Sequence, residues 1–285
     1  MKCVVLFCLF GLAISMPATY EPITLDYHET IGIPEAAAIK RSEESADFGG
    51  NRIVGGSAAG LGSNPWIGGL VVTLQTGQTS VCGSSLLTNT RAVTAAHCWR
   101  HGATTARQLV VVLGSTTLFS GGTRITSSNV QVHASYNPNN LNNDIAIITI
   151  SHVGYTNNIR NIALPTGSQL NNNFAGATAR AAGFGLQRDG GSITTGQTLH
   201  QVDLPVITNA VCQSTFGSSV VVGSTLCTSG ANGRSTCGGD SGGPLVTSNI
   251  LIGVTSFGSS AGCQRGFPAG FARVTSFASW INARI

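Results

Sequence analysis

Short apolar runs recur along most of the chain and are separated by clusters of Gly, Asn and Ser. Runs of this kind, bounded by turn-forming residues, are typical of β-strands. They cover residues 69–74, 91–96, 109–113, 144–150 and 178–182, and a hairpin is predicted from 245–247 and 250–257. The abundance of Gly, Asn and Thr disfavours long helices. The pattern therefore predicts an all-β chain.

The last residues of the chain follow a different pattern. Phe277, Trp280 and Ile281 recur at helical spacing, and Thr275 stands where a helix cap is expected. The spacing predicts one amphipathic C-terminal helix that packs on the body of the protein.

The first residues read as a targeting segment rather than as part of the fold. Met1-Lys2 is followed by an apolar run to Ile14, and Ala13-Ile14-Ser15 offers small residues at a cleavage site. The run is too short to span a bilayer. We expect residues 1–15 to be a secretory signal peptide and the protein to be secreted.

Residues 16–52 are acidic and contain no cysteine. The segment holds seven carboxylates and ends at Arg52, directly before Ile53-Val54-Gly55-Gly56. It could be a disordered acidic linker, but its end at a basic residue favours an activation propeptide. The remaining residues, 53–285, are of normal length for one all-β domain.

The net charge of the chain changes at Arg52. The whole chain has 15 Lys and Arg against 11 Asp and Glu, whereas residues 53–285 have eleven arginines against four aspartates, a net charge of +7. That part contains no lysine and no glutamate. Arginine stays charged above the pH at which lysine deprotonates. The composition is compatible with lineage bias or with work in strongly alkaline fluid. Because the arginines are scattered singly, nucleic-acid binding is not expected.

Three separate motifs carry residues suited to nucleophilic catalysis. Ser241 lies in the glycine-rich run Gly238-Gly239-Asp240-Ser241-Gly242-Gly243, His97 in Thr94-Ala95-Ala96-His97-Cys98, and Asp144 at the start of an apolar run. A serine hydroxyl needs a base to take its proton, and the base needs a third group to orient it. We predict Ser241 as nucleophile, His97 as general base and Asp144 as the group that orients His97.

These motifs, in this order, resemble the chymotrypsin-like (trypsin-fold) serine proteases, and the composition is similar to that of lepidopteran digestive chymotrypsins. The resemblance spans Ile53 to Ile285. It implies two six-stranded antiparallel Greek-key barrels, a C-terminal helix, and an active site in the cleft between the barrels. The oxyanion hole would be formed by the backbone N–H groups of Gly239 and Ser241.

The cysteines alone do not fix a disulfide pattern. Two leave with the signal peptide, and the other six allow 15 connectivities. The resemblance implies the pairs Cys82–Cys98, Cys212–Cys227 and Cys237–Cys263.

The resemblance also implies how the enzyme is activated. Cleavage after Arg52 frees the amino group of Ile53, which would insert and pair with Asp240. A buried ion pair of that kind is costly to break. Because the cut follows arginine, a trypsin-like protease should make it.

The expected specificity pocket is neutral. Ser235 matches the pocket floor, Gly258 one wall and Ala269 the second wall, while Ser256 begins the strand that pairs with substrate. No acid follows Asp240, so a substrate Lys or Arg would find no local partner. We predict cleavage after Phe, Tyr and Leu, with an elastase-like or collagenolytic broad specificity as the alternative.

Two other classes of protein share some of these motifs. Residues 239–243 also fit the G-x-S-x-G elbow of α/β-hydrolases, but that fold needs an acid and a histidine after the serine, and neither follows Ser241. A catalytically inactive homologue acting as a binding module would normally lack one of the three catalytic residues.

The remaining expectations concern cofactors, partners and location. Residues 100–143 contain no Asp or Glu, so we expect no calcium site, no other metal and no cofactor. The expected partners are protein and peptide substrates, the activating trypsin-like protease and protein protease inhibitors, without nucleic acid or membrane. We expect a secreted, extracellular monomer, active in the gut lumen.

Overall fold

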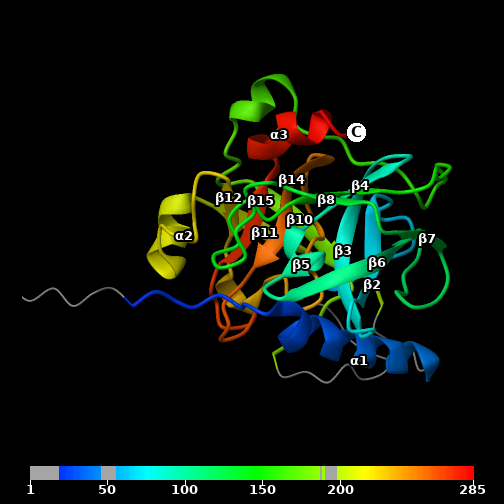
Figure 1. The fold of residues 1–285 in the computed structure, drawn as a ribbon. Coiled ribbons are helices and arrows are strands. Elements are labelled where there is room, and N and C mark those ends of the chain that lie inside the picture. Colours follow the sequence, from blue (N-terminus) through cyan, green and yellow to red (C-terminus); the bar gives the residue numbers. More distant parts are fainter. Residues whose placement is uncertain (1–18, 46–55, 187, 190–197) are drawn as a thin grey trace, which may run out of the picture.

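The structure is a computed structural model that describes residues 19–45, 56–186, 188–189 and 198–285. The predicted signal peptide lies outside the described residues, as do Arg52 and Ile53. Two antiparallel sheets pack side by side, one built from the first half of the chain and one mainly from the second (Figure 1). No helix among the described residues has the length and apolar character needed to cross a bilayer.

The first sheet has eight strands in the order β5-β6-β2-β3-β4-β9-β8, with β7 paired to β6. Leu70, Val72 and Leu74 alternate along β2 and are fully buried in its core. The strands are β2 (Ile67–Leu74), β3 (Thr79–Thr88), β4 (Arg91–Thr94), β5 (Arg100–His101), β6 (Thr104–Leu113), β7 (Thr123–Ser127), β8 (Val130–Val132) and β9 (Ala146–Thr149).

The second sheet closes into a ring of six strands. The order is β11-β10-β13-β14-β15-β12, with β12 pairing back to β11, and β1 adds to the outside of β11. Leu204, Leu226 and Phe271 fill its interior. The strands are β1 (Ser57–Ala58), β10 (Thr178–Gly183), β11 (His200–Ile207), β12 (Thr225–Thr228), β13 (Pro244–Thr247), β14 (Ile250–Phe257) and β15 (Ala269–Arg273).

The two-barrel, all-β fold with a C-terminal helix is confirmed. The helix α3 (Val274–Asn282) buries Phe277 and Ile281 as its spacing predicts, but its cap residue is Arg273, two residues before Thr275. Helices were also found where none was predicted. They are α1 (Ile33–Glu44) with the preceding π-helical turn η1 (His28–Gly32), α2 (Asn209–Phe216), and the 3-10 turns η2 (Ala96–Cys98), η3 (Gly167–Asn171) and η4 (Ala231–Gly233).

The six cysteines of residues 53–285 pair as the resemblance implies. The disulfides are Cys82–Cys98, Cys212–Cys227 and Cys237–Cys263. The first joins β3 to η2, and the third joins two loops of the second sheet that face the cleft. Each covalent link restricts the unfolded chain and stabilises the fold by roughly 2–4 kcal/mol.

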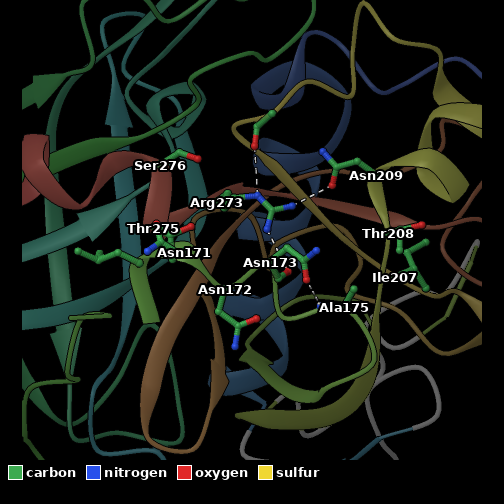
Figure 2. Close-up of a pocket in the computed structure, with 12 residues that line it drawn as sticks. Asn171, Asn172, Asn173, Ala175, Ile207, Thr208, Asn209, Arg273, Thr275 and Ser276 are labelled. Atoms are coloured by element: carbon green, nitrogen blue, oxygen red, sulfur yellow. Dashed lines mark hydrogen bonds between the residues drawn. The ribbon is translucent and has the colours of Figure 1, made fainter. Parts of the chain in front are cut away.

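A buried arginine holds together the end of the second sheet. The guanidinium of Arg273 donates to the carbonyl oxygens of Thr225 and Asn173 and to the side chain of Asn209, at 2.8–3.1 Å. Figure 2 shows Arg273, Asn173 and Asn209 at a cavity of about 420 Å³ between α3, η3 and α2. Burial lowers the pKa of Arg273. Because its donors are used by carbonyl and amide oxygens, this arginine has a structural role, and the cavity contains none of the predicted catalytic residues.

We predict that Arg273→Met lowers the free energy of unfolding by about 3 kcal/mol, since buried oxygens would lose their donors. In thermal unfolding this corresponds to a Tm about 5–10 °C lower. Arg107→Met, at an exposed position of β6, is the matched control and should leave the Tm nearly unchanged. Equal Tm values for the two variants would contradict the structural role of Arg273.

Candidate active site

Strand pairing brings His97 and Asp144 to the same edge of the first sheet. Thr94 in β4 lies opposite Ala146 in β9. His97 follows Thr94 by three residues, and Asp144 precedes Ala146 by two, so the antiparallel register places both beyond the same strand ends. The Cys82–Cys98 disulfide holds the residue after His97 against β3.

Asp144 is buried and accepts three hydrogen bonds. His97 Nδ1 lies 2.7 Å from Asp144 Oδ2, and the His97 backbone N–H donates to Oδ1 at 2.9 Å. The hydroxyl of Ser256 donates to Oδ2 at 2.6 Å. A carboxylate at Nδ1 favours the tautomer in which Nε2 is free to accept a proton. The arrangement therefore has the geometry that the predicted role of His97 as general base requires.

Ser256 has a contact that the sequence did not predict. Its position on β14 was expected to serve substrate pairing, whereas its side chain contacts Asp144, which belongs to the other sheet. The sequence gives no signal for this contact, because the two residues are 112 positions apart.

The loop that carries Ser241 is fixed by backbone hydrogen bonds. The Gly83 N–H of β3 donates to the Ser241 carbonyl at 2.7 Å, and the Gly242 N–H donates to the Thr255 carbonyl at 2.8 Å. Gly239 adopts φ +92°. A Cβ at this position would lie 2.8 Å from the Gly185 Cα, so position 239 requires glycine for both reasons. Ser241 and His97 line the same cavity.

Asp240 points away from the cleft into the protein. Its carboxylate accepts from the N–H groups of Gly185 at 2.9 Å and Cys237 at 3.0 Å. Burial raises its pKa to about 6, while these two bonds act in the opposite direction. A carboxylate buried in this way is suited to a cationic partner. The predicted partner, the amino group of Ile53 after a cut at Arg52, lies outside the described residues, so this pairing stays a prediction.

The cleft between the sheets holds a cavity of about 470 Å³. Ser235, Ser256 and Gly258 line it together with His97 and Ser241. A Cβ added at Gly258 would have nothing within 4 Å, so the cavity is open at this wall. Tyr27, Ile31 and Glu35 of the N-terminal segment line the same cavity, so this volume describes the cleft with that segment in place.

The structure does not support Ala269 as a pocket wall. Ala269 is 1% exposed and belongs to the core of the second sheet. Its strand β15 turns this side chain inward, and the neighbouring Phe267 and Pro268 line the cavity instead.

One acid lies closer to the cavity than the sequence indicates. Asp189 comes from a loop more than 50 residues before Ser241, yet it lines the cavity. Its carboxylate accepts from the N–H groups of Cys263 at 2.7 Å and Gln264 at 3.0 Å. No acid follows Asp240 in the sequence, and from this we predicted a pocket without a nearby carboxylate. That prediction did not consider Asp189, because its loop reaches the cleft only through tertiary packing.

The comparisons with known proteins agree with this geometry. A family model described as Trypsin matches residues 53–281. The chain is 42% identical to a collagenase of Hypoderma lineatum over 233 residues, which covers 81% of this chain and 86% of that protein. It is 36% identical to trypsin beta of Drosophila erecta, covering 81% of this chain and 87% of that protein.

A solved structure, that of HL collagenase, superposes with a TM-score of 0.76 at 41% sequence identity. The match covers 82% of this chain and 99% of that chain. The chain therefore belongs to the trypsin family of serine proteases, with the trypsin fold.

We predict that Ser256→Ala lowers kcat about tenfold, because Asp144 would lose one of its three donors and hold His97 less firmly. KM should change little, since the backbone of Ser256 is unaltered. Steady-state kinetics on a peptide substrate measures both constants. Ser214→Ala, an exposed serine on α2, is the control. A raised KM with unchanged kcat would instead assign the Ser256 side chain to substrate binding.

Proposed function

We propose that the protein is a secreted serine endopeptidase, made as a zymogen and activated by cleavage after Arg52. The observation that supports this most strongly is the buried His97–Asp144 pair beside Ser241 in one cleft. Ser241 would attack the peptide carbonyl, and His97 would take the Ser241 proton and later give it to the leaving amine. The N–H groups of Gly239 and Ser241 would stabilise the oxyanion.

We further propose that the enzyme cleaves after large apolar and aromatic residues. The support is the neutral Ser235 and the side-chain-free Gly258, which line the same cavity as His97 and Ser241. Location in an alkaline gut lumen is proposed from the all-arginine composition of residues 53–285, because arginine keeps its charge at high pH.

A broader, collagenolytic specificity is the second candidate. It is favoured by the relatives described as collagenases, at 41–42% identity. Asp189 at the cavity gives a possible partner for a basic substrate side chain, which a purely chymotrypsin-like pocket would lack.

The test compares hydrolysis of peptides with Phe, Leu, Ala or Arg before the scissile bond, at pH 7 and pH 10.5. We expect Phe and Leu to be cleaved fastest, with activity retained at pH 10.5. Cleavage after all four residues, together with cleavage of native collagen, would favour the broad alternative. If no substrate is turned over, the proposed endopeptidase activity is contradicted and an inactive homologue is favoured.

We predict that Gly258→Val reverses the preference for a peptide with Phe over a peptide with Ala before the scissile bond. The added side chain has space within the fold but projects toward the cavity, so it would block a large substrate side chain. We expect kcat/KM for the Phe peptide to fall by about 100-fold, a loss of a few kcal/mol of binding. The value for the Ala peptide should stay within a few-fold. An equal loss for both peptides would contradict Gly258 as a wall of the specificity pocket.

A further inference from the structure

Residues 19–45 lie across the cleft, where Ile23, Tyr27 and Glu35 line the cavity. This segment runs from the α2 side of the molecule to α1, which packs against the strands of the first sheet (Figure 1). We propose that residues 20–44, here called the covering segment, are an intramolecular inhibitor that occupies the catalytic groups, so that a cut after Arg52 yields activity only once the segment leaves. The proposal rests on the proposed endopeptidase function.

The covering segment enters where a substrate would be expected to pair. Ile23 forms an antiparallel bridge with Ser259, and the Ser260 N–H donates to the Pro22 carbonyl at 3.0 Å. The hydroxyl of Ser259 donates to the Glu21 carboxylate at 2.5 Å. Ser259 and Ser260 directly follow the predicted substrate-pairing residues 256–258, so the segment pairs with the backbone next to the edge that a substrate would use.

Tyr27 then covers the catalytic residues. Its ring packs edge-on against His97 with the centroids 4.7 Å apart, and its hydroxyl donates to the Val81 carbonyl at 2.8 Å. Tyr27 lines the same cavity as Ser241, and Ser241 and Gly239 are among the groups that act on the pKa of its hydroxyl. Tyr27 is 4% exposed. One side chain therefore occupies the predicted base, nucleophile and oxyanion donor together.

The backbone beside Tyr27 is held in a form that does not suit cleavage. Asp26 adopts φ +59°, whereas a substrate bound along a strand edge is extended. The Asp26 carbonyl accepts from the Thr30 N–H at 3.0 Å and the Thr30 hydroxyl at 2.9 Å. The chain after Tyr27 continues as the helical turn η1, so the segment covers the site in a conformation unlike that of an extended substrate.

Contacts on either side of Tyr27 anchor the segment. His28 is fully buried, and its Nδ1 lies 2.8 Å from the Ser80 hydroxyl. Ile31 packs against Gly238, where an added Cβ would lie 2.8 Å from the Ile31 Cγ2. At the end of α1, the Glu43 carboxylate accepts from the N–H groups of Leu118 and Phe119. An acidic segment on a body of net charge +7 is also favoured electrostatically. None of these contacts involves Arg52, so a cut there would not by itself break them.

Two buried groups make the affinity of the covering segment for the rest of the protein depend on pH. Burial, and secondarily the charge of Asp240, raises the pKa of Glu35 from 4.5 to about 8, and Tyr27 is the other titratable group that interacts with it. Burial, and secondarily His97, lowers the pKa of His28 from 6.5 to about 4, with Glu29 and His101 also acting on it.

The two groups act in different pH ranges. The segment binds best with Glu35 protonated, so affinity falls as pH rises from 4.5 to about 8. It binds best with His28 neutral, so affinity rises between pH 4 and 6.5. The two effects oppose each other up to pH 6.5, and above it only the loss from Glu35 remains. We expect weaker binding by on the order of tenfold between pH 6.5 and 8.

The experiment uses the secreted full chain, with Lys40→Gln and Arg41→Gln in every variant so that Arg52 is the only Lys or Arg of residues 16–52. The chain is cut to completion by immobilised trypsin, as judged by mass spectrometry, and assayed with a peptide substrate over a range of dilutions at pH 6.5 and 8. Gel filtration at each pH shows whether the segment stays with the body.

We expect the cut protein to have low specific activity when concentrated and its specific activity to rise at least tenfold on dilution. The covering segment should be released more readily at pH 8 than at pH 6.5. Tyr27→Ala should be fully active at every concentration, and Tyr27→Phe should lie between. Tyr20→Ala, an exposed tyrosine of the same segment, should behave like the parent. Glu35→Gln should remove the weakening between pH 6.5 and 8, whereas Glu44→Gln, exposed on α1, should keep it.

Two outcomes overturn the proposal and are distinguishable. Full activity of the concentrated protein immediately after the cut would refute the inhibitor while leaving the enzyme intact. A body that stays inactive and unlabelled by an organophosphonate, even after the segment is removed, would show that the proposed endopeptidase function fails and the inhibitor with it.

Discussion

The site depends on one buried carboxylate, that of Asp144. It accepts from the ring and the backbone of His97 in the first sheet and from Ser256 in the second. A buried carboxylate is tolerated only when its oxygens are satisfied, so the three donors and the sheets that carry them must be in place together. The same interaction that orients the predicted base therefore also fixes the two sheets relative to each other at the cleft.

Different elements contribute different features of the cleft. Glycines in the Ser241 loop give backbone donors, while the disulfide Cys237–Cys263 and the buried Asp240 hold that loop in shape. The N-terminal segment contacts the same groups, with Tyr27 against His97 and Ile31 against Gly238. Under these proposals the enzyme is kept inactive in two ways: the chain before Arg52 is uncut, and the covering segment occupies the site. The second depends on pH through Glu35.

Much of the fold and the core of the site could be predicted from the sequence. The alternation of apolar runs and turns located most long strands, and the motifs around His97, Asp144 and Ser241 identified residues that the structure brings together. The disulfide pairs came from the resemblance, because spacing alone allowed many pairings. What escaped prediction depends on contacts between distant segments: Ser256 on Asp144, Asp189 at the cavity, Ala269 turned into the core, and Tyr27 on His97. Local sequence carries no signal for such contacts.

The most direct test of the central role of Asp144 is the rate at which an organophosphonate labels Ser241 after activation, in the parent and in Asp144→Asn. An amide at this position would favour the wrong tautomer of His97, so we predict a single adduct on Ser241 in the parent and labelling slower by several orders of magnitude in the variant. Equal labelling rates in a variant that keeps the parent's Tm would contradict the account.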